Sequence, residues 1–186
     1  MNVVLGGSRN LSFMPELVGS KVADLINQSA YFLVGDAPGS DWAFQKYLYG
    51  MKYEKVEVFS SAGEIRHNVG HWKATHVDSG LKSKSSAVHA FKDRHMTKIA
   101  GLGIMIWDGE SAGTLSNVID LLDHRKECYL YMGSDQDFFL VDNRASLDRA
   151  LVKFPEVYEE AQKRLATFHA RAKKRAASEQ DTQTLF

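Results

Sequence analysis

The amino-acid sequence predicts an α/β protein with a mostly parallel sheet of about five to six strands and a long helix at the C-terminus. Two observations predict this fold class. Short apolar runs alternate with segments whose apolar residues recur at helical spacing, and three of the apolar runs end directly in glycine-rich turns. Strands that alternate with helices form parallel sheets with right-handed crossovers.

Three short strands and two helices account for the first part of the chain. The expected strands are 2–5, 31–34 and 56–59. The first helix covers 16–28, and the second begins at Ser40 or Asp41, either of which can cap it. The apolar face of this second helix consists of Trp42, Phe44, Tyr47, Leu48 and Met51.

Residues 60–86 show no periodicity, and we expect a long loop without a clear element. A loop of this length in a compact domain is usually functional or mobile. It contains His67, His71 and His76 at spacings of four and five. Without cysteines or an H-E-x-x-H pattern, these histidines favour a lid or an oligomer contact over a metal site.

The central stretch of the second part is an apolar strand at 104–107, which follows a helix expected at 87–100. The chain breaks at Asp108-Gly109 and restarts at Gly113-Thr114 as a helix over 114–125. The remaining expected elements are strands at 127–132 and 138–141, helices at 143–151 and 154–177, and a frayed tail at 178–186. This gives one domain, 1–177, with a core over 2–132 and a helical extension over 143–177.

The long C-terminal helix has acidic residues near its start and only basic charges over 163–175. This order complements the helix dipole and supplies ion pairs four residues apart. Two interpretations remain open. In one, the helix packs through Val157, Ala161, Leu165 and Phe168 and is otherwise solvated. In the other, it is a basic arm that contacts a partner or nucleic acid.

The composition limits the class of protein. At 186 residues the chain fits one domain, and its zero formal net charge gives no field that favours nucleic acid or an anionic membrane. The single Cys128 excludes an internal disulfide and a multi-cysteine metal site. No apolar run reaches about 18 residues, and no basic-then-apolar leader begins the chain. We expect a soluble, cytoplasmic protein.

Three predicted strands end in glycine-rich turns, at 6–9, 35–39 and 108–114. In parallel sheets ligands bind beyond the carboxyl ends of the strands. A strand that runs through a turn into a helix presents free N–H groups and a positive helix end, which suits a phosphate. None of the turns has the Gly-Lys-Ser/Thr ending or the G-x-G-x-x-G pattern, which argues against a standard ATPase or nicotinamide dehydrogenase.

Four segments together resemble the SLOG superfamily of nucleotide-binding proteins, with its YspA-like branch closest and the LOG and DprA branches beside it. The segments are Gly6-Gly7-Ser8-Arg9, Gly35-Asp36-Ala37-Pro38-Gly39-Ser40-Asp41, Lys92-Asp93-Arg94-His95-Met96, and Trp107-Asp108-Gly109-Glu110-Ser111-Ala112-Gly113-Thr114 with Asn117. The match covers roughly residues 2–132. It implies a Rossmann-like three-layer sandwich that binds a nucleotide or nucleotide-derived ligand, with no required cofactor or metal, and that forms a homodimer or higher homo-oligomer.

The resemblance implies a set of ligand-binding residues. They are Gly7, Ser8, Arg9, Gly35, Asp36, Gly39, Asp41, Met96, Trp107, Asp108, Gly109, Ser111, Gly113, Thr114 and Asn117. Phosphate would contact Ser8, Arg9 and the first turn after Gly113, while the acids of the second turn would bind ribose or base. Simpler roles remain open: Ser111 or Thr114 as a helix cap, Asp41 as a cap, and Trp107 as a core residue that does not stack on a base.

The chemistry implied by the LOG branch depends on a position where this chain differs. LOG enzymes hydrolyse the base–ribose bond of a nucleoside monophosphate with a Glu three residues after the Gly-Thr pair, and that position is Asn117 here. An amide cannot take a proton or stabilise an oxocarbenium ion as a carboxylate does. The remaining catalytic candidates are Asp93, Asp108 and Glu110.

Two functions therefore stay open. The first is a nucleotide sensor or binding module without turnover, which Asn117 favours. The second is a phosphoribohydrolase-type enzyme that cleaves or transfers at the N-glycosidic bond. DprA-like nucleic-acid binding is a weaker third possibility, because the net charge is neutral.

Overall fold

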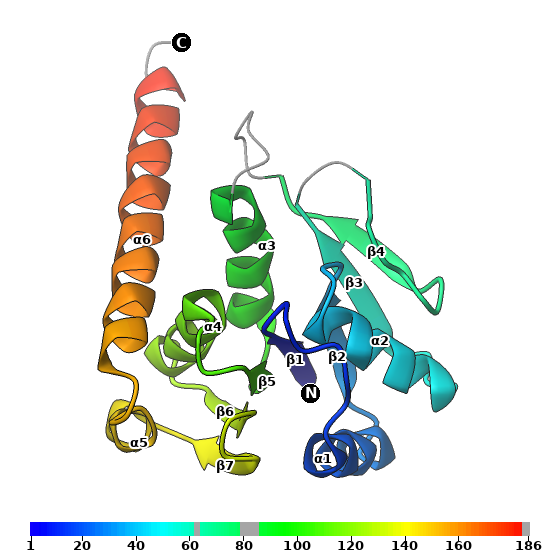
Figure 1. Ribbon diagram of the computed structural model, residues 1–186. Helices are drawn as coiled ribbons and strands as arrows, with labels where there is room; N and C mark the ends of the chain where they lie inside the picture. The colour runs from blue at the N-terminus through cyan, green and yellow to red at the C-terminus, as the bar shows by residue number, and fades with distance from the viewer. Residues whose placement is uncertain (62–63, 79–85, 184–186) are drawn as a thin grey trace.

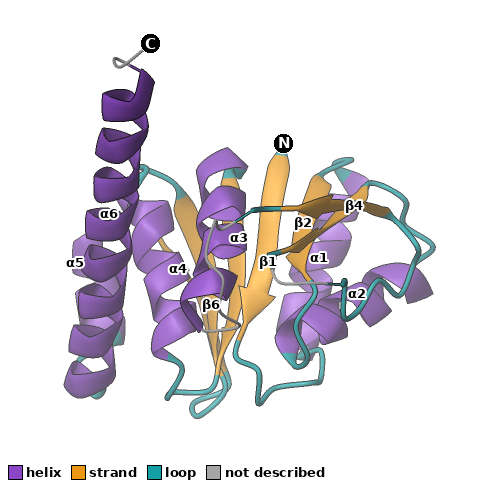
Figure 2. Ribbon diagram, turned by 90° about the horizontal axis from the view of Figure 1, so that it is seen from above, coloured by secondary structure: helices purple, strands orange, loops and turns teal. Residues whose placement is uncertain are grey.

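The computed structural model describes residues 1–61, 64–78 and 86–183, and it confirms the α/β fold with helices on both faces of one sheet (Figure 1, Figure 2). The strands are β1 (Asn2–Gly7), β2 (Tyr31–Gly35), β3 (Val56–Ser60), β4 (Lys73–His76), β5 (Leu102–Trp107), β6 (Glu127–Met132) and β7 (Asp137–Val141). The helices are α1 (Glu16–Asn27), α2 (Ser40–Gly50), α3 (Ser86–Ile99), α4 (Ala112–Asp123), α5 (Arg144–Ala150) and α6 (Pro155–Gln183). Among the described residues, no helix is long and apolar enough to cross a membrane.

The seven strands lie in the order β4-β3-β2-β1-β5-β6-β7, and every neighbouring pair is parallel except β6 and β7. The sheet has more strands than predicted because β4 forms inside the segment expected to be a loop. This edge strand pairs with β3 through its backbone, from Lys73 opposite Glu57 to His76 opposite Ser60. Its side chains are mostly exposed, so the sequence carries no apolar periodicity that could have revealed it.

Two smaller expectations were wrong. Neither Ser40 nor Asp41 caps α2: the N-cap is Gly39, whose φ of 83° suits glycine, and no side chain caps it. The tail expected from residue 178 continues as helix α6 to Gln183, and residues 184–186 lie outside the described part of the chain.

Each face of the sheet has its own apolar core, and the central strands contribute to both. In β1, Val4 faces the core under α3 and α4, whereas Val3 and Leu5 face the core under α1 and α2. In β5, Met105 and Ile106 divide in the same way. This alternation follows from the two-residue period of a strand. The buried sheet holds the turns after β1 and β5 side by side, because Gly7 pairs with Ile106.

The long helix α6 packs beside α4, so the packed interpretation of this helix is confirmed for its first half (Figure 2). Ala161 and Leu165 are buried, and the Ser116 hydroxyl of α4 donates to the Ala161 carbonyl at 3.0 Å. Phe168 meets Phe91 of α3 edge-to-face, with ring centroids 5.0 Å apart. These contacts fix α6 against both α3 and α4.

Substituting Gly7 tests the close approach of β1 to β5. A Cβ on Gly7 would lie 2.2 Å from the Ile106 carbonyl oxygen, which is backbone and cannot move aside. We expect Gly7→Ala to lower the free energy of unfolding by about 1–3 kcal/mol in urea titrations. Gly50→Ala is the matched control, because a Cβ there meets nothing within 4 Å. Equal stability of the two variants would contradict this packing.

Candidate functional site

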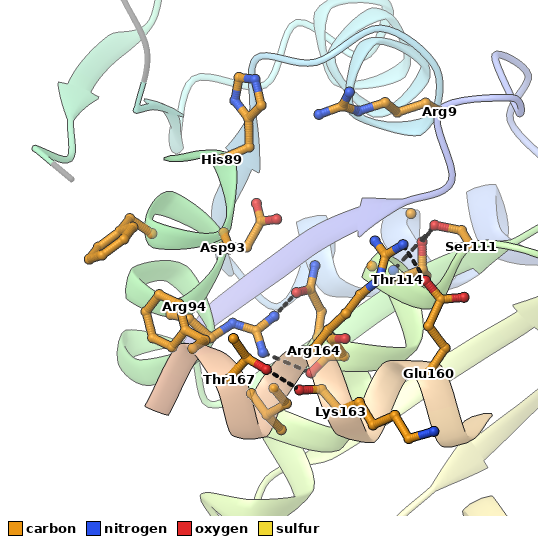
Figure 3. Close-up of a pocket in the computed structure, with 18 of the residues that line it drawn as sticks. Arg9, His89, Asp93, Arg94, Ser111, Thr114, Glu160, Lys163, Arg164 and Thr167 are labelled. Carbon is orange, nitrogen blue, oxygen red and sulfur yellow. Dashed lines mark hydrogen bonds and ion pairs between the residues drawn. The ribbon is translucent and has the colours of Figure 1, made fainter. Parts of the chain in front are cut away.

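A cavity of about 670 Å³ lies at the carboxyl ends of β1 and β5, between α3, α4 and α6 (Figure 3). From β1 the sheet extends through β2, β3 and β4 on one side and through β5, β6 and β7 on the other. The cavity therefore lies at the point where the strand order reverses. In α/β proteins with parallel sheets this is where ligands bind, and the volume is in the range of small-molecule sites.

The turn after β5 is organised by the carboxylate of Asp108. Its Oδ1 accepts hydrogen bonds from the Ser8 hydroxyl at 2.9 Å and from the N–H groups of Glu110 and Ser111 at 3.0 and 2.9 Å. Its Oδ2 accepts from the Asn10 amide at 3.2 Å. Although partial burial alone would raise the pKa of Asp108, these donors hold it below its usual value. At neutral pH this group is an ionised anchor and not a proton donor.

Helix α4 begins at the cavity with a capped first turn. Ser111 is the N-cap, accepting from the Thr114 N–H at 3.3 Å, which confirms the capping role for Ser111. The Thr114 hydroxyl donates to Ser111 Oγ at 3.0 Å. The N–H of Gly113 has no acceptor among residues 1–61, 64–78 and 86–183, and Gly113 lines the cavity. The positive end of the α4 dipole and one free donor thus face the cavity.

A buried lysine joins the second turn to helix α3. Lys92 is 3% exposed, and its Nζ lies 3.0 Å from Asp93 Oδ1 and 3.5 Å from Asp41 Oδ2. Burial alone would lower the pKa of Lys92, but the two carboxylates raise it above its ordinary value, so the ammonium group persists. Asp41 also accepts the Ala37 N–H at 3.1 Å. This arrangement places Asp93 on the cavity wall beside a fixed positive charge.

Asp36 is engaged by an arginine that the sequence analysis did not single out. Arg66 donates from Nε to Oδ2 at 3.0 Å and from a terminal nitrogen to Oδ1 at 2.6 Å. The fork geometry makes this a strong pair. Burial alone would raise the pKa of Asp36, but Arg66 and Lys92 lower it. Asp36 is 1% exposed and does not line the cavity.

Arg94 of α3 holds Asn117 in place at the cavity. It donates to the Ser116 carbonyl at 2.8 Å and to Oδ1 of Asn117, and its Nε lies 3.7 Å from Asp120 Oδ2. Burial lowers the pKa of Arg94, while Asp120 and Asp93 act in the opposite direction. The Asn117 amide is therefore oriented by a buried guanidinium.

The structure brings most of the expected site residues together at the cavity. Those lining it are Gly7, Arg9, Asp93, Asp108, Glu110, Ser111, Gly113, Thr114 and Asn117. A smaller adjoining cavity of about 50 Å³ is lined by Asp41 and Met96, among others.

Other expected residues lie behind the wall. Neither cavity is lined by Ser8, Gly35, Asp36, Gly39, Trp107 or Gly109. Trp107 is fully buried, donates to the Ser111 carbonyl at 3.1 Å and packs edge-to-face on Phe154, which is the core role left open for it.

Two groups of lining residues were not assigned to the site from the sequence. The first is His89, Phe91 and Arg94 on α3, and the second is Glu160, Lys163, Arg164, Leu165, Thr167, Phe168 and Arg171 on α6. The His89 Nδ1 atom is buried without a hydrogen-bond partner among the described residues. Burial, with Arg66, Arg9 and Lys92 nearby, lowers the pKa of His89, so its imidazole is neutral at physiological pH.

No protein-family model, curated protein or solved structure matches this chain. Among the described residues, no group of three or more histidine, cysteine or acidic side chains could hold a metal ion.

The hydrogen bonds accepted by the Asp108 carboxylate predict a contribution to the free energy of unfolding that depends on pH. Asp108→Ala removes the acceptor of two N–H groups and a hydroxyl, and we expect it to cost about 1–3 kcal/mol of unfolding free energy at pH 7. Because the pKa of Asp108 is lower in the folded protein than its value of about 3.9 in the unfolded chain, this contribution is present above about pH 4. It is lost as the pH falls through the folded-state pKa.

Urea titrations at pH 7 and pH 3 measure this effect. The difference between the wild type and Asp108→Ala should shrink at the lower pH. Asp24→Ala, on the exposed face of α1, is the control and should change stability little at either pH. A difference that is equally large at both pH values would show that Asp108 acts through packing alone.

Proposed function

We propose that the cavity binds a nucleotide or nucleotide-derived ligand and that the protein is a member of the SLOG superfamily acting as a sensor or binding module. The observation that carries the proposal is the position of the cavity at the strand-order reversal, with the free N–H of Gly113 and the guanidinium of Arg9 on its wall. Arg9 has no hydrogen-bonding or ion-pair partner among the described residues. An unpaired guanidinium and a helix N-terminus on the wall of one cavity suit a phosphate group.

Two of the three acidic candidates are already engaged by the protein, which favours binding without turnover. Asp108 accepts the hydrogen bonds of the turn and Asp93 is paired with Lys92, whereas Glu110 lines the cavity but is exposed to solvent. Asn117 has its oxygen turned toward Arg94. A glycosidic-bond hydrolase needs one carboxyl group free to exchange a proton or stabilise positive charge.

A thermal-shift panel tests the binding. A ligand that binds the folded state raises the unfolding midpoint by mass action, so a nucleotide of the correct base should raise it in the wild type and much less in Arg9→Ala. Arg149→Ala, on α5 and away from the cavity, is the charge-matched control and should keep the full shift. If no nucleotide raises the unfolding midpoint of the folded wild-type protein, the proposal of a nucleotide site is wrong.

The enzymatic alternative rests on Asp93, which is the candidate carboxylate shared by both cavities. Chromatography of each bound nucleotide after incubation should show it unchanged if the protein is a sensor. Release of free base that disappears in Asp93→Asn, while Glu156→Gln outside the cavity remains active, would instead establish an N-glycosidase despite Asn117.

A further inference from the structure

The α6 side of the cavity is rich in positive charge. Lys163 and Arg164 line it from this helix, together with Arg94 from α3 (Figure 3), and Arg171 of α6 lines it as well. The acidic residue that lines it from the same helix is Glu160. This excess is local, because the whole chain has a formal net charge of zero.

The pairing of these cations identifies the one that is free. Lys163 is paired with Glu159 at 2.6 Å, and Arg164 donates from Nε to Glu160 at 2.9 Å. Arg94 donates hydrogen bonds to Asn117 and Ser116 and is paired with Asp120. Arg171 has no hydrogen-bonding or ion-pair partner within the part of the chain that the structure describes, and the same holds for Arg9 on the opposite wall. The cavity thus has an unpaired guanidinium on each of two walls.

The packing of α6 fixes the backbone position of Arg171. Phe168, three residues before it, packs on Phe91, and Ala161 and Leu165 are buried on the same side of α6. The Ser116–Ala161 hydrogen bond adds a polar contact at 3.0 Å. Arg171 is therefore carried by a docked helix and belongs to the wall of the cavity.

We infer that the ligand carries two anionic groups, one bound at Arg9 and the start of α4 and the other at Arg171 on α6. On the proposed nucleotide function, on which this inference rests, the ligand class is a nucleoside diphosphate or a longer phosphate ester in preference to a nucleoside monophosphate. A monophosphate brings one anionic group, which Arg9 and the start of α4 would bind. A second phosphate group has the charge and the oxygen acceptors that Arg171 requires.

Calorimetric titration of the full chain with the four nucleoside monophosphates and the four diphosphates tests this. For the preferred base, the diphosphate should bind about tenfold or more tightly than the monophosphate. Arg171→Ala should remove this preference and leave the affinity for the monophosphate unchanged. Arg9→Ala should instead lower the affinity for both ligands. Lys173→Ala is the matched control, because it removes an exposed charge from the same helix outside the cavity and should change neither affinity.

The outcomes separate the two claims. Equal affinities of monophosphate and diphosphate in the wild type, or an Arg171→Ala variant that weakens both equally, would overturn the second anionic subsite while the nucleotide site stands. Absence of binding by all eight compounds to folded wild-type protein would overturn the nucleotide site and this inference together.

Discussion

The hydrogen bond between Ser8 and Asp108 connects the ends of the two central strands, and the shape of the site depends on it. It joins residues 100 positions apart in the sequence at a donor–acceptor distance of 2.9 Å. The same carboxylate oxygen accepts two N–H groups of the following turn, so one partly buried anion fixes the end of β1, the turn after β5 and the start of α4. A charged acceptor with several donors is among the stronger arrangements in a protein.

This constraint determines which groups are left for a ligand. Three donors are already taken by the Asp108 carboxylate. They are the N–H groups of Glu110 and Ser111 and the Ser8 hydroxyl. The groups left for a phosphate are therefore the Gly113 N–H, Arg9 and, on α6, Arg171. The buried ion pairs of Asp36 with Arg66 and of Lys92 with Asp41 and Asp93 hold the neighbouring turn and α3 in position. Removing one member of a buried pair leaves an uncompensated charge, which is costly.

The sequence was sufficient where structure is encoded locally. Apolar runs and helical spacing predicted six strand positions and six helices, and the glycine-rich turns predicted that Gly7, Asp108 and Gly113 meet at one edge. Strand β4 could not be predicted, because an exposed edge strand is held by backbone pairing and has no apolar pattern. The α6 wall also could not be predicted. Its stripe of Ala161, Leu165 and Phe168 indicates a packed face but not the helices that it meets, and those contacts are long-range.

The central claim is that a phosphate-bearing ligand binds at the first turn of α4. Nuclear magnetic resonance of uniformly ¹⁵N-labelled protein tests it directly, by following the Gly113 amide and the Arg9 side-chain Nε–H during titration with nucleotides. We expect both resonances to move in a saturable way with one dissociation constant, since both groups face the cavity without a protein acceptor. Saturable shifts confined to residues away from the carboxyl ends of β1 and β5, with Gly113 and Arg9 unmoved, would contradict the account.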